Sequence, residues 1–143
     1  MKPGRDALVT LVTGGPWLRG ALTLACSLPP HREYDLLALC ENMTDDERGA
    51  MAASGWTCVA PQTFIANPHK GSPWKWEFQA KLQPFNMTSY RRVLYLDSDI
   101  IVNDPSGIDE LFGLPDIPPG FVYGVRDCVA PGACGSLWSA SEF

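Results

Sequence analysis

The sequence predicts an α/β protein built on a parallel sheet. Three short segments rich in apolar and β-branched residues, at positions 7–13, 34–40 and 57–60, are predicted strands. Segments with helical spacing or a helix cap separate them, and strand alternating with helix is typical of a parallel sheet. The chain has 143 residues, of which 45% are hydrophobic. That length suits a single domain, and that composition suits a packed core.

The elements of the first half have local explanations. The run ALVTLVT at residues 7–13 lacks polar alternation, so we expect a strand that is buried on both faces. Apolar residues recur at helical spacing across residues 17–28, and a proline pair ends that helix. A second apolar strand follows at residues 34–40. Thr44 and Glu47 have the spacing of a capping box, which predicts the start of a second helix. The third strand comes next.

The second half is expected to hold a loop, a helix beginning near Trp74, a fourth strand, a short helical turn and a fifth strand. The last three are predicted at residues 93–102, 108–112 and 121–128. Residues 130–143 show no clear period. No repeat or linker divides the chain, so we expect one domain over residues 1–143.

The charge distribution narrows the class of partner. Acidic residues outnumber basic ones by 16 to 11, and no cluster of lysine or arginine occurs. Binding to nucleic acid needs clustered cations, so it is not expected as the main function. The chain shows no signal peptide and no apolar run that could span a bilayer. We therefore expect a cytoplasmic protein without a membrane segment, with a Golgi location as the alternative if the true N-terminus is longer.

The five cysteines leave at least one thiol unpaired within the chain. Cys26, Cys40 and Cys58 lie inside predicted apolar elements, and we interpret them as small buried hydrophobic residues. Cys128 and Cys134 flank the sequence VAPGA, a spacing that matches no strong zinc pattern. Their role is left open.

The stretch VLYLDSDIIV, residues 93–102, ends an apolar strand in two aspartates. Ligands bind at the carboxyl ends of strands in open α/β sheets. Residues i and i+2 of a strand point to one face, roughly 7 Å apart, so Asp97 and Asp99 could share one hard cation. The alternative is a surface turn without function. A phosphatase of the haloacid dehalogenase type is disfavoured. In that group the motif usually lies at the start of the fold, whereas here it comes after three predicted strands.

Four stretches give the chain its resemblance to a known family: VTLVTGGPWLRGALTLACSL, KLQPFNMTSYRRVLYLDSDIIV, IDELF and LPDIPPGFVYGVRDC. Together they resemble glycosyltransferase family 8, the group that contains glycogenin and galactinol synthase. The second stretch follows the family pattern almost position by position, and the fourth is closest to the galactinol synthase type. The resemblance extends from Val9 to Cys128.

The resemblance implies a Rossmann-like GT-A fold and transfer of a hexosyl group, glucose or galactose, from a UDP-sugar with retention of configuration. Asp97 and Asp99 would hold Mn²⁺, with Mg²⁺ as an alternative. Ser98 would lie near the sugar nucleotide, and Lys81 would contact the donor. The loop that receives uridine would comprise Leu11, Thr13, Gly14 and Trp17. No catalytic residue is assigned, because the front-face mechanism proposed for the family requires no nucleophile.

Each of these residues also has a structural interpretation. Lys81 could be a solvated helix lysine, Trp17 could staple the first helix to the sheet, and Thr13 could cap a strand end. Trp74 and Trp76 are interpreted as core anchors, with sugar stacking as the alternative. Gly14 stands where the family often has asparagine.

The family motifs that follow the fourth stretch are not found in these residues. We therefore expect about the N-terminal half of a family domain, with weak or absent activity by itself. The alternatives are a non-catalytic UDP-sugar-binding module and a plain α/β domain with an acidic turn. The sequence leaves open the sugar and the acceptor, which could be a protein, inositol or a glycan.

Overall fold

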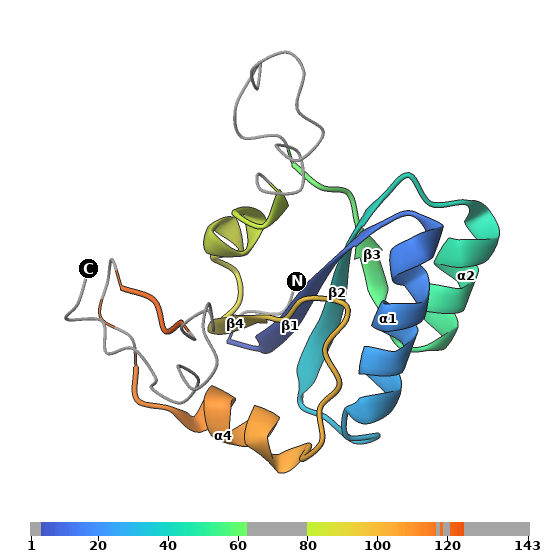
Figure 1. The fold of residues 1–143 in the computed structure, drawn as a ribbon. Coiled ribbons are helices and arrows are strands. Elements are labelled where there is room, and N and C mark those ends of the chain that lie inside the picture. Colours follow the sequence, from blue (N-terminus) through green and yellow to red (C-terminus); the bar gives the residue numbers. More distant parts are fainter. Residues whose placement is uncertain (1–3, 63–79, 117, 119–120, 125–143) are drawn as a thin grey trace, which may run out of the picture. The chain divides into compact units, whose positions relative to one another are not determined.

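A computed structural model describes residues 4–62, 80–116, 118 and 121–124 (Figure 1). The chain divides into two compact units, residues 1–112 and 113–143, and the sheet belongs to the first. The elements are, in order, β1 (Asp6–Thr13), α1 (Gly15–Ser27), β2 (Tyr34–Glu41), α2 (Asp45–Ala53), β3 (Thr57–Val59), the 3-10 helix η1 (Gln83–Asn86), β4 (Arg92–Tyr95) and α4 (Ser106–Gly113).

The four described strands form one parallel sheet in the order β3-β2-β1-β4. β1 pairs with β2 along its whole length, from Asp6 opposite Tyr34 to Thr13 opposite Glu41. It pairs with β4 over its first half, ending at Val9 opposite Tyr95. The three strands and two helices predicted for the first half are confirmed, including the capping box of Thr44 and Glu47 at the start of α2.

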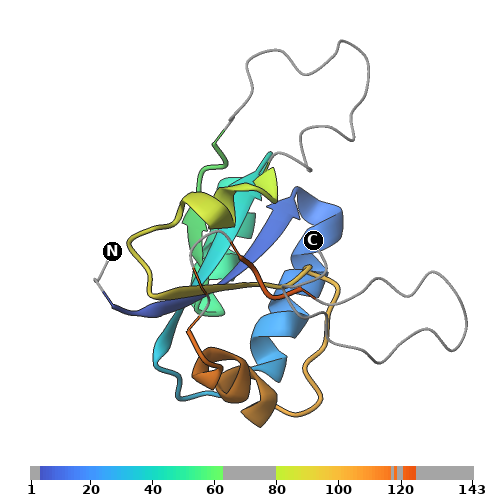
Figure 2. The same ribbon diagram turned by 90° about the vertical axis from the view of Figure 1, so that its left-hand side faces the viewer.

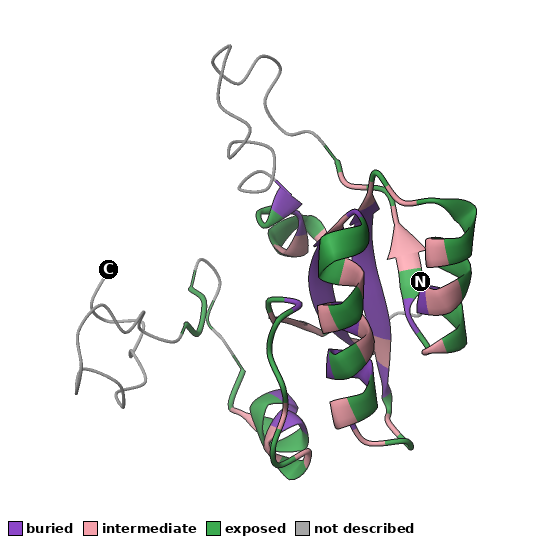
Figure 3. Cartoon of the chain, turned by 45° about the vertical axis from the view of Figure 1, so that its right-hand side comes forward, coloured by how far each residue is buried: buried purple, intermediate pink, exposed green. Residues whose placement is uncertain are grey.

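The sheet separates two hydrophobic clusters. Helices α1 and α2 lie together on one side, and η1 lies on the other (Figures 1 and 2). The cluster under the helices includes Leu8, Val12, Ala38 and Leu24. The opposite cluster includes Val9, Leu11, Leu37 and Leu39 with Ala80 and Tyr90. The interior of β1 is buried on both faces, as its unbroken apolar sequence predicts (Figure 3).

The described helices are short, and α1, with 13 residues, is the longest of them. None within the described ranges combines the length and the apolar character that crossing a bilayer requires.

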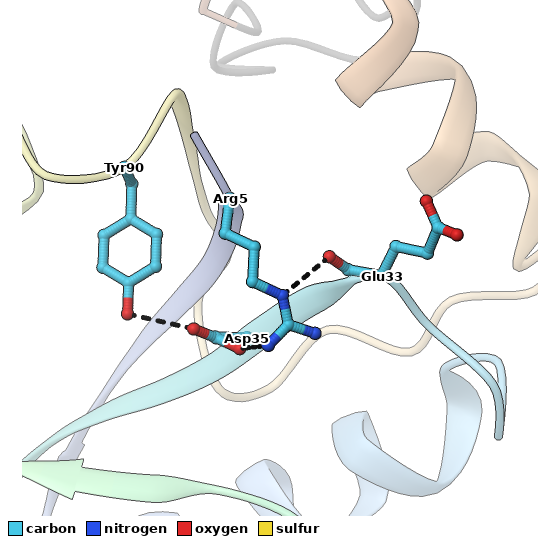
Figure 4. A network of polar contacts seen from close by, with 4 residues as sticks. All are labelled: Arg5, Glu33, Asp35 and Tyr90. Atoms are coloured by element: carbon cyan, nitrogen blue, oxygen red, sulfur yellow. Dashed lines mark hydrogen bonds and ion pairs between the residues drawn. The ribbon is translucent and has the colours of Figure 1, made fainter. Parts of the chain in front are cut away.

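A polar network joins the amino ends of β1 and β2 to the segment before β4 (Figure 4). Arg5 pairs with Asp35 at 2.6 Å, and its Nε donates to the Glu33 carbonyl at 3.3 Å. The Tyr90 hydroxyl donates to the other oxygen of Asp35 at 3.2 Å. Burial, together with the charge of Asp35 and the hydrogen bond to it, raises the pKa of Tyr90. This network holds the end of the sheet opposite to the predicted site.

The second half differs from its prediction in two strands. The fourth strand ends at Tyr95, before the aspartates, because Asp97 and Asp99 favour a turn over a strand. The predicted fifth strand is wrong over residues 121–124, where Phe121 donates to the Pro118 carbonyl in a turn. Residues 125–128 and the tail 130–143 lie outside the described residues, as do Trp74 and Trp76 with most of the predicted helix.

The prediction for three of the cysteines is corrected. Cys40 of β2 and Cys58 of β3 form a disulfide with a Cα–Cα distance of 5.5 Å, because the register brings these neighbouring strand residues together. Cys26 is exposed on α1 and is the free cysteine of the described part. Cys128 and Cys134 lie outside it. Disulfides are typical of oxidising compartments, and the cytoplasmic location stays a prediction.

The disulfide should stabilise the outer part of the sheet. It closes a loop with a sequence separation of 18, which the chain-entropy account values at about 3 kcal/mol. We expect dithiothreitol to lower the free energy of unfolding by roughly that amount, measured by urea unfolding. A Cys26→Ser variant should show the same loss. Equal urea midpoints with and without the reductant would contradict the pairing.

Candidate functional site

The topology singles out one edge of the sheet as the place for a ligand. The chain leaves β1 toward β2 and β3 on one side and returns to β4 on the other, so β1 and β4 flank a topological switch point. Ligands of open α/β sheets bind at such points, outside the carboxyl ends of the strands. We call this the carboxyl edge; it is formed by the ends of β1, β2 and β4 at Thr13, Glu41 and Tyr95.

The aspartate motif forms a turn at the carboxyl edge, and we call residues Asp97, Ser98 and Asp99 the DSD turn. Leu96 still donates to the Val9 carbonyl at 3.0 Å, and Ile100 then donates to the Asp97 carbonyl at 3.3 Å. Asp97 and Asp99 are exposed, whereas Ser98 is only 6% exposed. The turn therefore presents its carboxylates to solvent and buries its middle residue.

The buried middle of the DSD turn rests against α1. A Cβ placed on Gly20 would lie 2.5 Å from the Ser98 carbonyl oxygen, closer than a Cβ atom can approach a backbone oxygen. A glycine is therefore required at this point of the helix. The contact holds the backbone of the turn against α1, and with it the positions from which both carboxylates project.

Lys81 and Tyr95 converge on Asp97. Lys81 Nζ lies 2.7 Å from Asp97 Oδ1, and the Tyr95 hydroxyl donates to the same oxygen at 2.9 Å. The ammonium also lies 5.7 Å from the centre of the Tyr95 ring. The side chains of Lys81 and Asp97 are 41% and 51% exposed, so the ion pair adds little to stability. Either partner can therefore exchange the other for a ligand at small cost.

The carboxylates of the DSD turn suit a hard cation that is shared with a ligand. Mg²⁺ and similar ions are commonly held by one or two carboxylates together with substrate phosphates. Within residues 4–62, 80–116, 118 and 121–124, no group of three or more His, Cys, Asp or Glu side chains is placed to hold a metal. A cation here would thus depend on ligands beyond Asp97 and Asp99.

The end of β1 supplies the rest of the predicted site. Gly14 has a φ of 79°, a conformation that favours glycine, and its N–H donates to the Glu41 carbonyl at 2.9 Å. Thr13 is half-buried beside it, and Leu11 is packed in the core. Trp17 is 46% exposed, so it does not act as a buried staple between α1 and the sheet.

Gly15, the first residue of α1, lies against the capping box of α2. A Cβ at this position would lie 2.8 Å from Oε1 of Glu47, the side chain that completes the capping box of α2. The absence of a side chain at Gly15 makes room for that carboxylate. Gly14 is thus the loop glycine whose backbone conformation shapes the site.

Sequence reasoning missed two contributors to this site. Tyr95 lies two residues before Asp97, and the two-residue period of a strand could have placed them on one face. Gly20 carries no signal in the sequence, because its role depends on the packing of α1 against a turn 78 positions later in the chain.

Comparison with known proteins places the chain in a family. It is 36% identical over 109 residues to inositol phosphorylceramide glucuronosyltransferase 1 of Arabidopsis thaliana, covering 74% of this chain and 20% of that protein. It is 31% identical to galactinol synthase 4 of Arabidopsis thaliana, over 97% of this chain and 41% of that protein. Galactinol synthase 2 of Solanum lycopersicum is 29% identical over 93% of this chain and 38% of its own length. No family model matches the chain.

The parallel sheet and its Rossmann-like strand order agree with the GT-A fold of glycosyltransferases, which the sequence predicts. The chain belongs to the glycosyltransferase family 8 group, as its sequence motifs predict. It spans less than half the length of the relatives named above.

The contact between Gly20 and Ser98 can be tested with two glycine-to-alanine variants. Gly20→Ala should lower the free energy of unfolding by about 1–3 kcal/mol, because the new methyl group displaces the DSD turn. Gly49→Ala in α2 is the matched control, since nothing lies within 4 Å of its Cβ position. The control should gain about 0.5–1 kcal/mol from helix propensity. Urea unfolding measures both, and an equal gain in the two variants would contradict the packing.

Proposed function

We propose that the carboxyl edge binds a UDP-sugar together with a divalent cation, Mn²⁺ or alternatively Mg²⁺. The protein to which this chain belongs would transfer a hexosyl group, glucose or galactose, from that donor to an acceptor with retention of configuration. The observation that carries the proposal is the convergence of Lys81, Tyr95 and Asp97 at the switch point of the sheet. Membership of a glycosyltransferase family and a relative named as a glucuronosyltransferase support it.

The described residues fit two complementary tasks at the diphosphate. Asp97 and Asp99 would hold the cation, which when bound would offset the charge that develops on the leaving diphosphate. Lys81 Nζ is held at the same place by Asp97, and once that carboxylate has a cation, the ammonium can donate to a phosphate oxygen. The low cost of breaking an exposed ion pair makes this exchange feasible.

The end of β1 would receive the nucleoside. Gly14 keeps the backbone free of a side chain at the end of the strand, and the exposed indole of Trp17 offers a flat surface one helical turn away. Thr13 and Leu11 precede this loop, and Ser98 would border the donor from the DSD turn.

The chemistry implied by the family is a substitution at the anomeric carbon of the donor sugar. The bond from that carbon to the diphosphate oxygen breaks, and the bond to the acceptor oxygen forms on the same face. The acceptor proton passes to the leaving diphosphate. No side chain of this chain is assigned as a nucleophile, and the acceptor, whether protein, inositol or glycan, is not proposed further.

A second candidate is a non-catalytic module that binds the UDP-sugar with the help of a metal. It is favoured by the small number of carboxylates at the DSD turn, since cation affinity follows the number of ligands. Binding of UDP without sugar transfer would distinguish this module from an enzyme.

Calorimetric titration of UDP tests the proposed site. In the presence of Mn²⁺ we expect binding, and we expect EDTA to weaken it at least about tenfold, because the cation links the carboxylates to the phosphates. The Asp97→Asn/Asp99→Asn variant should show the same loss with Mn²⁺ present. The matched control is Asp109→Asn/Glu110→Gln, which removes the same charge from the exposed surface of α4. A folded protein that does not bind UDP under any of these conditions would contradict the proposal.

A further inference from the structure

Glu41 ends β2 at the carboxyl edge and touches the loop that follows β1. It lies opposite Thr13 in the parallel register, and its carbonyl accepts the hydrogen bond from Gly14 N–H at 2.9 Å. The position is therefore tied through the backbone to the start of the loop assigned to the nucleoside.

The side chain of Glu41 lies on the same face of the sheet as the neighbouring site residue. Leu37 and Leu39 of β2 belong to the cluster on the η1 side, whereas Leu36, Ala38 and Cys40 belong to the cluster under the helices. Because side chains alternate along a strand, Glu41 continues the row of Leu37 and Leu39. Thr13 continues the row of Leu11 in the same way, so the two side chains are neighbours on one face.

Glu41 is exceptional among the partly buried acidic residues. The described part of the chain holds four such side chains, those of Asp6, Asp35, Glu41 and Glu47. Asp6 pairs with Arg91, Asp35 binds Arg5 and Tyr90, and Glu47 binds Thr44. No described group donates a hydrogen bond to the carboxylate of Glu41. The Glu41 carboxylate is therefore open to accept hydrogen bonds, and a bound ligand with hydroxyl groups would supply the donors.

We propose that the Glu41 carboxylate accepts hydrogen bonds from the ribose hydroxyls of the donor nucleotide; this assignment rests on the proposed function. In dinucleotide-binding folds of similar topology, an acidic residue about 20 residues beyond the loop after the first strand binds the ribose. A carboxylate repels phosphate, so it also sets the direction of the ligand along the carboxyl edge. The nucleoside lies toward Glu41 at the end of β2, and the diphosphate lies toward Lys81 and the DSD turn at the end of β4.

The test compares UDP with 2′-deoxy-UDP by calorimetry in the presence of Mn²⁺, on the wild type and on Glu41→Gln. The wild type should bind UDP about tenfold or more tightly than the deoxy compound, as expected for a hydrogen bond to a charged group. Glu41→Gln should lose about tenfold in affinity for UDP and retain less than a twofold preference over the deoxy compound. The matched control is Glu33→Gln, an exposed glutamate just before the opposite end of β2 that should change neither value.

The outcomes separate this inference from the proposed function. If Glu41→Gln keeps the wild-type affinity for UDP and the wild-type preference over 2′-deoxy-UDP, the role of Glu41 is overturned. The proposed UDP site would stay intact in that case. A loss of affinity with an unchanged preference would overturn the assignment to the ribose hydroxyls. If the folded wild type binds no UDP with Mn²⁺, the proposed function fails and the assignment of Glu41 fails with it.

Discussion

The hydrogen bonding and burial of β1 are the constraint on which the rest of the structure depends. The strand is buried on both faces, so its backbone groups have to be paired by neighbouring strands, β2 on one side and β4 on the other. The parallel direction of these strands brings their ends to a single edge. Gly14, Glu41 and the DSD turn, which lie far apart in the sequence, therefore follow strand ends at the same edge of the sheet.

The candidate site combines a fixed backbone with exposed charges. The contact between Gly20 and the Ser98 carbonyl determines where the DSD turn lies, while Lys81 and Asp97 are exposed and can exchange partners. A binding site benefits from this division, because a well-supported backbone positions the ligand groups and weakly held side chains can reorganise around them. At the other end of the sheet, the network of Arg5, Asp35 and Tyr90 is more buried and serves to hold the strands.

Local sequence signals predicted the parts of the fold that depend on local physics. The apolar run of residues 7–13 and the capping box at Thr44 were both informative. Features that depend on register or on distant packing could not be predicted. The pairing of Cys40 with Cys58 requires the alignment of β2 with β3, and the support from Gly20 requires the packing of α1 on the DSD turn. The fourth strand was predicted too long, because the turn preference of the aspartates was underestimated.

The location of the bound metal and nucleotide tests the central claim most directly. Amide NMR spectra recorded with UDP and a substoichiometric amount of paramagnetic Mn²⁺ would reveal which residues lie near the ion. The account predicts selective broadening for Gly14, Lys81 and the DSD turn, with the signals of Arg5 and Glu33 at the opposite end of the sheet unaffected. Broadening centred on the amino ends of β1 and β2, or spread evenly over exposed acidic residues, would contradict it.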